Sequence, residues 1–214
     1  MIKVERFVCN MIRENTYVLS DESNECVIID CGAYYAEEQR AITEYISRER
    51  LQPMHLIATH GHIDHNFGNK LIADNYQLQV EVHHSDEQLM QHLDEQAISI
   101  AGVTLDFKEP PVGKYLTGSD EIQFGSHKLE LIETPGHTKG SVCFYCKSEN
   151  LLFTGDTLFQ GSVGRTDMPG GSMFMLIQSL RTLSQMPDET VVLPGHGERS
   201  TIGDELKQNP YFDR

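Results

Sequence analysis

No run of apolar residues in this 214-residue chain approaches the roughly 18 residues that a membrane-spanning helix requires. Residues 1–10 alternate like a strand and include Lys3, Glu5 and Arg6, so they lack the apolar core of about 7–15 residues that marks a secretory signal. Apolar residues make up 39% of the chain and charged residues 23%, a balance typical of globular proteins. We therefore expect a cytoplasmic protein without a membrane partner.

Basic side chains are scarce. The chain has 17 Lys and Arg against 32 Asp and Glu, which gives a net charge of −15. Two bound divalent cations, which add four positive charges, would leave about −11. The densest basic segment, residues 48–50, is interrupted by an acid. Because such a chain repels a phosphate backbone, we expect no nucleic-acid partner, and the charge itself is consistent with simple solubility.

Cysteines are few and odd in number: five, at positions 9, 26, 31, 143 and 146. An odd count without a secretory signal argues against a disulfide framework. Cys143 and Cys146 form a C-x-x-C motif, but they fall in a segment predicted to be a strand, where residues three apart point to opposite faces. We therefore do not expect a redox or metal-binding cysteine pair.

The chain has no short-period repeat and no Gly/Ser-rich linker, so we expect one domain over residues 1–214. Its periodicity predicts strands over residues 3–8, 16–19, 26–29, 54–58, 78–82, 121–124, 128–132, 142–145, 151–153 and 190–193. It predicts helices over residues 35–47, 66–74, 85–92, 172–183 and 202–208. Strands followed by a strand–helix mixture, twice over, indicate an α/β or α+β sandwich of two sheets with helices outside.

Two of these segments carry more detailed expectations. Ser172 is the expected cap of the helix over residues 172–183, whose apolar face would consist of Met173, Leu176, Ile177 and Leu180. Residues 94–117, with consecutive prolines and a glycine, are predicted to form a loop. That loop could cover a substrate or lie plainly on the surface.

Residues 59–65, Thr-His-Gly-His-Ile-Asp-His, hold the densest group of metal-ligand side chains: His60, His62, Asp64 and His65. They follow the short apolar strand predicted over residues 54–58, and Gly61 lets the backbone bend so that alternate side chains converge. Imidazole nitrogens and carboxylate oxygens suit zinc, iron or manganese. A catalytic zinc usually takes three protein ligands and a water, so four candidates in six residues suggest two metals.

Three further candidates, His137, Asp156 and His196, follow predicted strands after a glycine-containing turn. Each alone is commonly a turn residue or a helix cap. Four such strand ends in one chain, however, make a shared metal site the better interpretation. Zinc is favoured by the ligand types, and iron or manganese would fit the same set.

These motifs resemble the metallo-β-lactamase fold superfamily, and within it the glyoxalase II-type hydrolases. The resemblance spans roughly residues 1–210, including GDTLFQGSVGRTD at 155–167. It implies an α+β fold of four layers, αββα. It also implies that His60, His62 and His137 hold one metal, that Asp64, His65 and His196 hold the second, and that Asp156 bridges them. His60, His62, Asp64 and Asp156 would carry the catalysis, and Asp30 would support a ligand from beside the metal loop.

The resemblance implies a chemistry as well. Two metals lower the pKa of a shared water, and the resulting hydroxide attacks a carbonyl that one metal polarises. The implied substrate is a small-molecule thioester of glutathione, typically S-lactoylglutathione. Arg165 matches a glutathione-binding basic residue of longer family members. Two of their tyrosines are replaced by Asp167 and Glu198, and only 18 residues follow His196, so a C-terminal helical glutathione-binding extension is expected to be absent.

Several alternatives stay open. Two acids near a dianionic tripeptide oppose its binding, so the enzyme could instead hydrolyse another thioester or a different small ester or lactone. A persulfide dioxygenase of the same fold shares Gly-Arg-Thr-Asp but uses a single iron. A secreted β-lactamase fits less well, because it would need a signal peptide and usually lacks the bridging aspartate. A non-catalytic module would usually have lost a ligand residue, and none is lost here. The sequence does not decide the oligomeric state.

Overall fold

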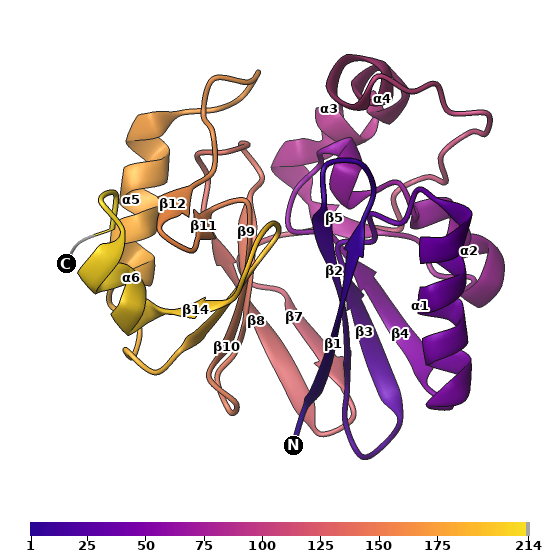
Figure 1. Ribbon diagram of the computed structural model, residues 1–214, viewed down its shortest axis with the longest axis horizontal. Coiled ribbons are helices and arrows are strands. Elements are labelled where there is room, and N and C mark those ends of the chain that lie inside the picture. Colours follow the sequence, from indigo (N-terminus) through magenta and orange to yellow (C-terminus); the bar gives the residue numbers. More distant parts are fainter. Residues whose placement is uncertain (213–214) are drawn as a thin grey trace.

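Two six-stranded sheets face each other in the computed structural model, which describes residues 1–212, and helices cover the outer face of each sheet (Figure 1). The first sheet has the order β1-β2-β3-β4-β5-β6, with strands β1 (Lys3–Cys9), β2 (Glu14–Ser20), β3 (Glu25–Ile29), β4 (Gln52–Ile57), β5 (Glu81–His83) and β6 (Lys114–Leu116). The second has the order β14-β13-β10-β9-β8-β7, with strands β7 (Glu121–Phe124), β8 (His127–Glu133), β9 (Val142–Cys146), β10 (Leu151–Gly155), β13 (Val191–Pro194) and β14 (Ser200–Thr201). The short β11 (Leu158–Phe159) and β12 (Ser162–Val163) form a separate ribbon.

The central strands are buried on both faces. Every residue of β2 and of β9 is buried, as expected for strands packed against the other sheet on one side and helices on the other. The core between the sheets is aromatic and aliphatic, and Tyr17 of β2 meets Phe153 of β10 edge to face with ring centroids 5.3 Å apart. Two further apolar cores fill the spaces under the helices on each side. The predicted four-layer α+β fold is confirmed.

The helices on the first sheet are α1 (Ala36–Arg48), α2 (Asn69–Tyr76), α3 (Glu87–Met90) and α4 (Leu93–Ala101), and those on the second are α5 (Met173–Leu183) and α6 (Ile202–Gln208). Ser172 caps α5 as predicted, because its Oγ accepts a hydrogen bond from the Met175 amide. The apolar face of α5 was predicted correctly at Leu176 and Leu180 and wrongly at Met173 and Ile177. Its buried residues are Leu176, Ser179, Leu180 and Leu183, whereas Met173 and Ile177 are 44% and 40% exposed.

The predicted loop over residues 94–117 was also wrong in part, because it contains α4 and β6. Leu93 and Ala97 of α4 are buried, and Gly102 ends the helix in a left-handed conformation with a φ of 70°. The helix predicted over residues 85–92 is divided into a 3-10 turn, η2 (His84–Asp86), and the short α3. The helix predicted over residues 66–74 begins at Asn69 and is preceded by a second 3-10 turn, η1 (Ile63–His65).

Cys143 and Cys146 lie on opposite faces of β9, as predicted. Cys143 packs in the core beneath α5, whereas Cys146 packs in the core between the sheets. All five cysteines are buried and unbonded. Among residues 1–212, no helix is both long and apolar enough to cross a membrane.

Candidate metal centre

Residues 59–65, here called the metal loop, follow the end of β4 and are buried. His60, His62, Asp64 and His65 are each at most 6% exposed. Buried ionisable groups are costly unless they have partners, so their environment decides what the loop can do. The loop backbone is fixed by Asn66, whose Nδ2 donates to the carbonyls of His60 (3.2 Å) and His62 (2.6 Å).

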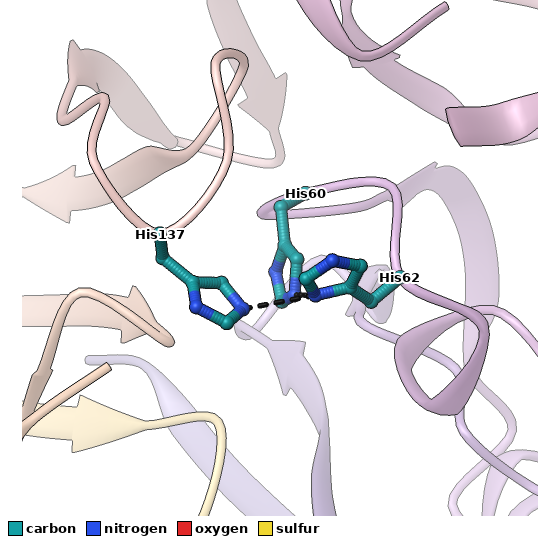
Figure 2. Close-up of side chains that lie close together, drawn as sticks. All are labelled: His60, His62 and His137. Carbon is teal, nitrogen blue, oxygen red and sulfur yellow. Dashed lines mark hydrogen bonds between the residues drawn. The ribbon is translucent and has the colours of Figure 1, made fainter. Parts of the chain in front are cut away.

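Three imidazoles from two different sheets meet at one point (Figure 2). His62 Nδ1 lies 3.1 Å from His60 Nε2 and 2.9 Å from His137 Nε2. The His137 loop follows β8, so this histidine comes from the second sheet. The other nitrogen of His137, Nδ1, lies 2.7 Å from the Arg165 carbonyl, which can only accept a hydrogen. Nδ1 therefore carries the proton, and Nε2 presents a lone pair to the cluster.

Two of these imidazoles are held in the neutral form that binds metals. Burial lowers the pKa of His60 well below its ordinary value, and the neighbouring histidines lower it further. Burial, followed by the influence of His137, lowers the pKa of His62 to about 4. At neutral pH both rings are unprotonated, so no proton has to be displaced before a cation binds.

Asp64, His65 and His196 form a second group next to the first. His196 Nε2 lies 3.3 Å from Asp64 Oδ2, and His65 Nε2 lies 3.6 Å from the same oxygen. Burial alone would lower the pKa of His65, but the charges of Asp64, Asp156 and Asp30 raise it well above its ordinary value. A divalent cation at this position would take the place of the His65 proton.

Asp156, which follows β10, lies between the two groups. Its Oδ1 is 3.3 Å from His65 Nε2, and its Oδ2 is 3.5 Å from His137 Nε2. Burial would raise the pKa of this carboxyl, but the charge of His65 outweighs it and holds the pKa well below the ordinary value. Asp156 Oδ1 and His65 Nε2 are buried and have no hydrogen-bond partner among residues 1–212. Because such orphaned polar atoms are rare in folded proteins, they fit a donor set made for cations.

Asp30 supports the second group from behind. Its Oδ2 lies 3.0 Å from His65 Nδ1, while its Oδ1 accepts from the Thr59 amide at 2.7 Å. The contact makes Nδ1 the protonated nitrogen of His65 and turns Nε2 toward the cluster. Asp30 adopts a left-handed φ of 53°, uncommon for a residue other than glycine.

Sequence reasoning missed Glu14, the first residue of β2. This carboxyl is fully buried beside Asp30 and His65, and its Oε2 accepts from Thr16 Oγ1 at 2.8 Å. Burial raises its pKa well above the ordinary value, so the side chain is neutral. Nothing in the local sequence marks it, because an acid at the start of a strand usually faces solvent.

The two groups open into a cavity of about 320 Å³. Its lining consists of Ile12, His62, Asp64, Ile100, His137, Asp156, Phe159, Arg165, Met168 and His196. Arg165 is therefore at the cavity, but it pairs with Asp167 through two hydrogen bonds of 2.7 Å. Glu198 pairs in the same way with Arg6 at 3.2 Å. His83 is not part of the groups and pairs with Glu133 at 3.1 Å.

A family model described as the metallo-beta-lactamase superfamily matches residues 12–196, so the chain belongs to that superfamily. Among curated relatives, the probable metallo-hydrolase YqgX of Bacillus subtilis is 31% identical, over 99% of this chain and 98% of its own. The hydroxyacylglutathione hydrolase GloC of Haemophilus influenzae is 30% identical, over 99% of both chains. These relatives, together with the family, support a metal-dependent hydrolase.

Solved structures share the fold across the whole chain. BLEG-1 B3 metallo-beta-lactamase superposes with a TM-score of 0.87 at 31% identity, covering 99% of both chains. TTHA1623 in a di-iron-bound form has a TM-score of 0.85 at 31% identity, covering 98% of this chain and 100% of its own. ETHE1 from Myxococcus xanthus has a TM-score of 0.78 at 25% identity, covering 97% of this chain and 83% of its own. The family and the His/Asp cluster indicate divalent metal ions, with zinc and iron both compatible.

Proposed function

We propose that this protein is a dinuclear metal-dependent thioesterase of the glyoxalase II type, acting on S-lactoylglutathione or a related small thioester. One observation carries the proposal: two groups of ligand-type side chains lie next to each other and are spanned by the carboxylate of Asp156. In this proposal His60, His62 and His137 hold one cation, and Asp64, His65 and His196 hold the other. No serine or cysteine nucleophile is needed.

Two divalent cations, when bound, supply an acidified water and a positive field at a carbonyl oxygen. The chain supplies the arrangement around them. Neutral His60 and His62 present lone pairs, and Asp156 divides its two oxygens between the groups. Asp30 and the Arg165 carbonyl hold His65 and His137 in the required tautomers. The groups are thus oriented before any substrate arrives.

The cavity supports a small acyl substrate. Ile12, Ile100, Phe159 and Met168 give it apolar walls, and a volume of about 320 Å³ lies near the lower end of the range for small-molecule sites. The Haemophilus influenzae relative is a hydroxyacylglutathione hydrolase. Asp167 and Glu198, which by sequence would repel an anionic thiol carrier, are each paired with an arginine. Their local pairing weakens the argument against a glutathione thioester.

A persulfide dioxygenase is the second candidate, because ETHE1 of Myxococcus xanthus shares the fold at 25% identity. All seven ligand-type residues are present here, including His65 and His196. The second group therefore has the side chains that a second cation needs, which favours the dinuclear hydrolase. Hydrolysis of a β-lactam is a third possibility to test, since BLEG-1 B3 metallo-beta-lactamase is 31% identical.

The test is metal content of the purified protein alongside three assays: hydrolysis of S-lactoylglutathione, oxygen uptake with glutathione persulfide, and hydrolysis of a chromogenic β-lactam. About two metals per chain with thioester hydrolysis supports the proposal. One iron with oxygen uptake and no hydrolysis moves the assignment to a dioxygenase.

Two variants sharpen this test. Asp156→Ala removes the carboxylate that both groups share and should abolish turnover and lower the metal content. Cys143→Ser is the matched control, because Cys143 is buried in the core beneath α5, and it should change neither. Retained turnover in Asp156→Ala would contradict the two-metal scheme.

A further inference from the structure

Asp86 is a buried carboxylate outside both ligand-bearing loops. It is the last residue of η2, between β5 and α3, and only 1% of its side chain is exposed. Within residues 1–212 no lysine or arginine pairs with it, and its hydrogen-bond partners there are two backbone amides and one hydroxyl. Sequence reasoning missed it, because an acid after His83-His84 and Ser85 looks like an ordinary helix-start residue.

The partners of Asp86 belong to the two loops that carry the first histidine group. Oδ2 accepts from the Gly61 amide at 2.9 Å and from Thr138 Oγ1 at 2.7 Å. Oδ1 accepts from the Gly140 amide at 2.7 Å. Gly61 stands between His60 and His62, and Thr138 directly follows His137. One carboxylate therefore joins the metal loop of the first sheet to the His137 loop of the second.

Both glycines are required by close contact with this region. A Cβ added to Gly61 would lie 2.8 Å from Leu89 Cβ and 3.2 Å from Asp86 Cβ. A Cβ added to Gly140 would lie 2.7 Å from Asp86 Cγ and 2.8 Å from its backbone nitrogen. The glycines allow each loop to approach the carboxylate closely enough for its amide to bond. This close packing is an observation separate from the hydrogen bonds, and it too indicates that Asp86 joins the two loops.

The second group is held by other side chains. Asp30 contacts His65, and the Asn10 side chain donates to the Asp64 carbonyl at 2.8 Å. The strand end before His196 is bound by Asn15, whose Nδ2 donates to the Pro194 carbonyl at 2.9 Å. Loss of Asp86 therefore loosens one group and leaves the supports of the other in place.

We propose that Asp86 is a positioning residue that fixes His137 relative to His60 and His62, and so sets the affinity of this group for a divalent cation. The inference rests on the proposed two-metal function. Partners outside the ligand set typically change metal affinity about 10–100-fold when they are removed. The effect should be selective: the His60–His62–His137 site weakens, while the Asp64–His65–His196 site keeps its affinity.

Asp86→Asn tests this in the full-length protein. The asparagine amide replaces one accepting oxygen with an NH₂ donor. In one orientation this donor faces the Gly140 amide; in the other it faces the Gly61 amide and Thr138 Oγ1. We expect one Zn²⁺ to bind about 10–100-fold more weakly in chelator competition, and the other within about threefold of the wild type. The absorption spectrum of the Co²⁺-loaded variant should lose the contribution of one site. Thr138→Val removes one of the three hydrogen bonds to Asp86, together with the 2.8 Å contact of Thr138 Oγ1 with Ser141 Oγ, and should weaken the same site less.

Asp21→Asn is the matched control. Asp21 is also a buried aspartate that accepts from backbone amides, those of Ser23 and Ser126, and from His127. It directly follows the end of β2 opposite Glu14, about 20 Å away along the strand. The Asp21→Asn substitution should lower the free energy of unfolding without changing the affinity of either cation site.

The outcomes distinguish a wrong role for Asp86 from a wrong two-metal function. A wild type that binds two Zn²⁺ while Asp86→Asn binds both with unchanged affinity overturns the role of Asp86 alone. Equal weakening of both sites in Asp86→Asn, or weakening in Asp21→Asn, shows general destabilisation and also overturns it. A wild type that binds no divalent cation overturns the two-metal function, and the inference with it.

Discussion

Replacing Asp30 with asparagine should weaken the second cation site through the tautomer of His65. The Asp30 carboxylate accepts from the Thr59 amide, from Thr59 Oγ1 and from His65 Nδ1. An asparagine oxygen can still accept from the Thr59 amide. Its NH₂ group cannot accept from His65, so when a cation displaces the Nε2 proton, the proton that remains on Nδ1 has lost its acceptor and is favoured to move to Nε2. The nitrogen meant for the cation would then carry a hydrogen.

The size of the effect follows from the lost contact. A hydrogen bond to a charged group contributes about 1.5–3 kcal/mol, and this one is buried. Holding His65 in the metal-binding tautomer against that preference therefore costs about 1.5–3 kcal/mol, which corresponds to about a 10–150-fold weaker cation affinity. Asp30 reaches the first group through Thr59, whose Oγ1 donates to Asp30 Oδ2 at 2.8 Å and lies 3.1 Å from His60 Nδ1. Because this link is indirect, the affinity of the first group should fall less.

Zn²⁺ competition with a chromogenic chelator measures both affinities, and ¹⁵N NMR of the imidazole nitrogens in the Zn²⁺-loaded protein reports which nitrogen of His65 carries the remaining proton. Asp21→Asn is again the control, because Asp21 Oδ2 lies 2.9 Å from His127 Nδ1 in a partly buried carboxylate–histidine pair that belongs to neither ligand group. If Asp30→Asn binds both cations like the wild type and His65 stays protonated at Nδ1, the tautomer argument is wrong.

Two further predictions concern stability. Burial raises the pKa of Glu109 to about 8, and in the part of the chain that the structure describes neither carboxylate oxygen has a hydrogen-bond partner. Because the unfolded chain ionises near 4.5, the wild type should lose free energy of unfolding as the pH rises from about 4.5 to about 8. Glu109→Gln removes the ionisable group, so the variant should be more stable than the wild type by about 3 kcal/mol at pH 7 and by little at pH 4.5, as measured by urea denaturation. Removing cations with a chelator should lower the free energy of unfolding by about 2.7 kcal/mol per site, relative to protein at a free cation concentration of 100 times Kd. An unchanged melting temperature after chelation, with loss of metal confirmed, would contradict that coupling.

The ligand-type residues could be predicted because each follows the same local pattern. His137, Asp156 and His196 all come after a strand and a glycine-containing turn, and the second sheet brings the ends of these strands together. The local pattern identifies the candidates without knowledge of strand order. The pairing of Arg165 with Asp167 was accessible for a similar reason, since the two are separated by a single residue.

Other features depend on contacts that no local pattern contains. Asp86 lies 25 positions from Gly61 and 54 from Gly140 along the chain. The buried face of α5 is set by its packing against the second sheet, which leaves Met173 and Ile177 exposed although the apolar sequence had placed them in the core. Glu14 is buried because β2 is covered on both faces, and its strand pattern gives no sign of this.

Neither group of ligands is complete within one sheet. The metal loop after β4 supplies four side chains, but the first group needs His137 and the second needs His196, both from the second sheet. Polar contacts join the sheets near the site, among them Asp86 to Thr138, and Tyr17 Oη to the Pro194 carbonyl at 2.8 Å. Cations that bind across this junction bind the folded chain and not the unfolded one. The same residues that we propose to hold the catalytic metals should therefore also couple metal binding to the association of the two halves.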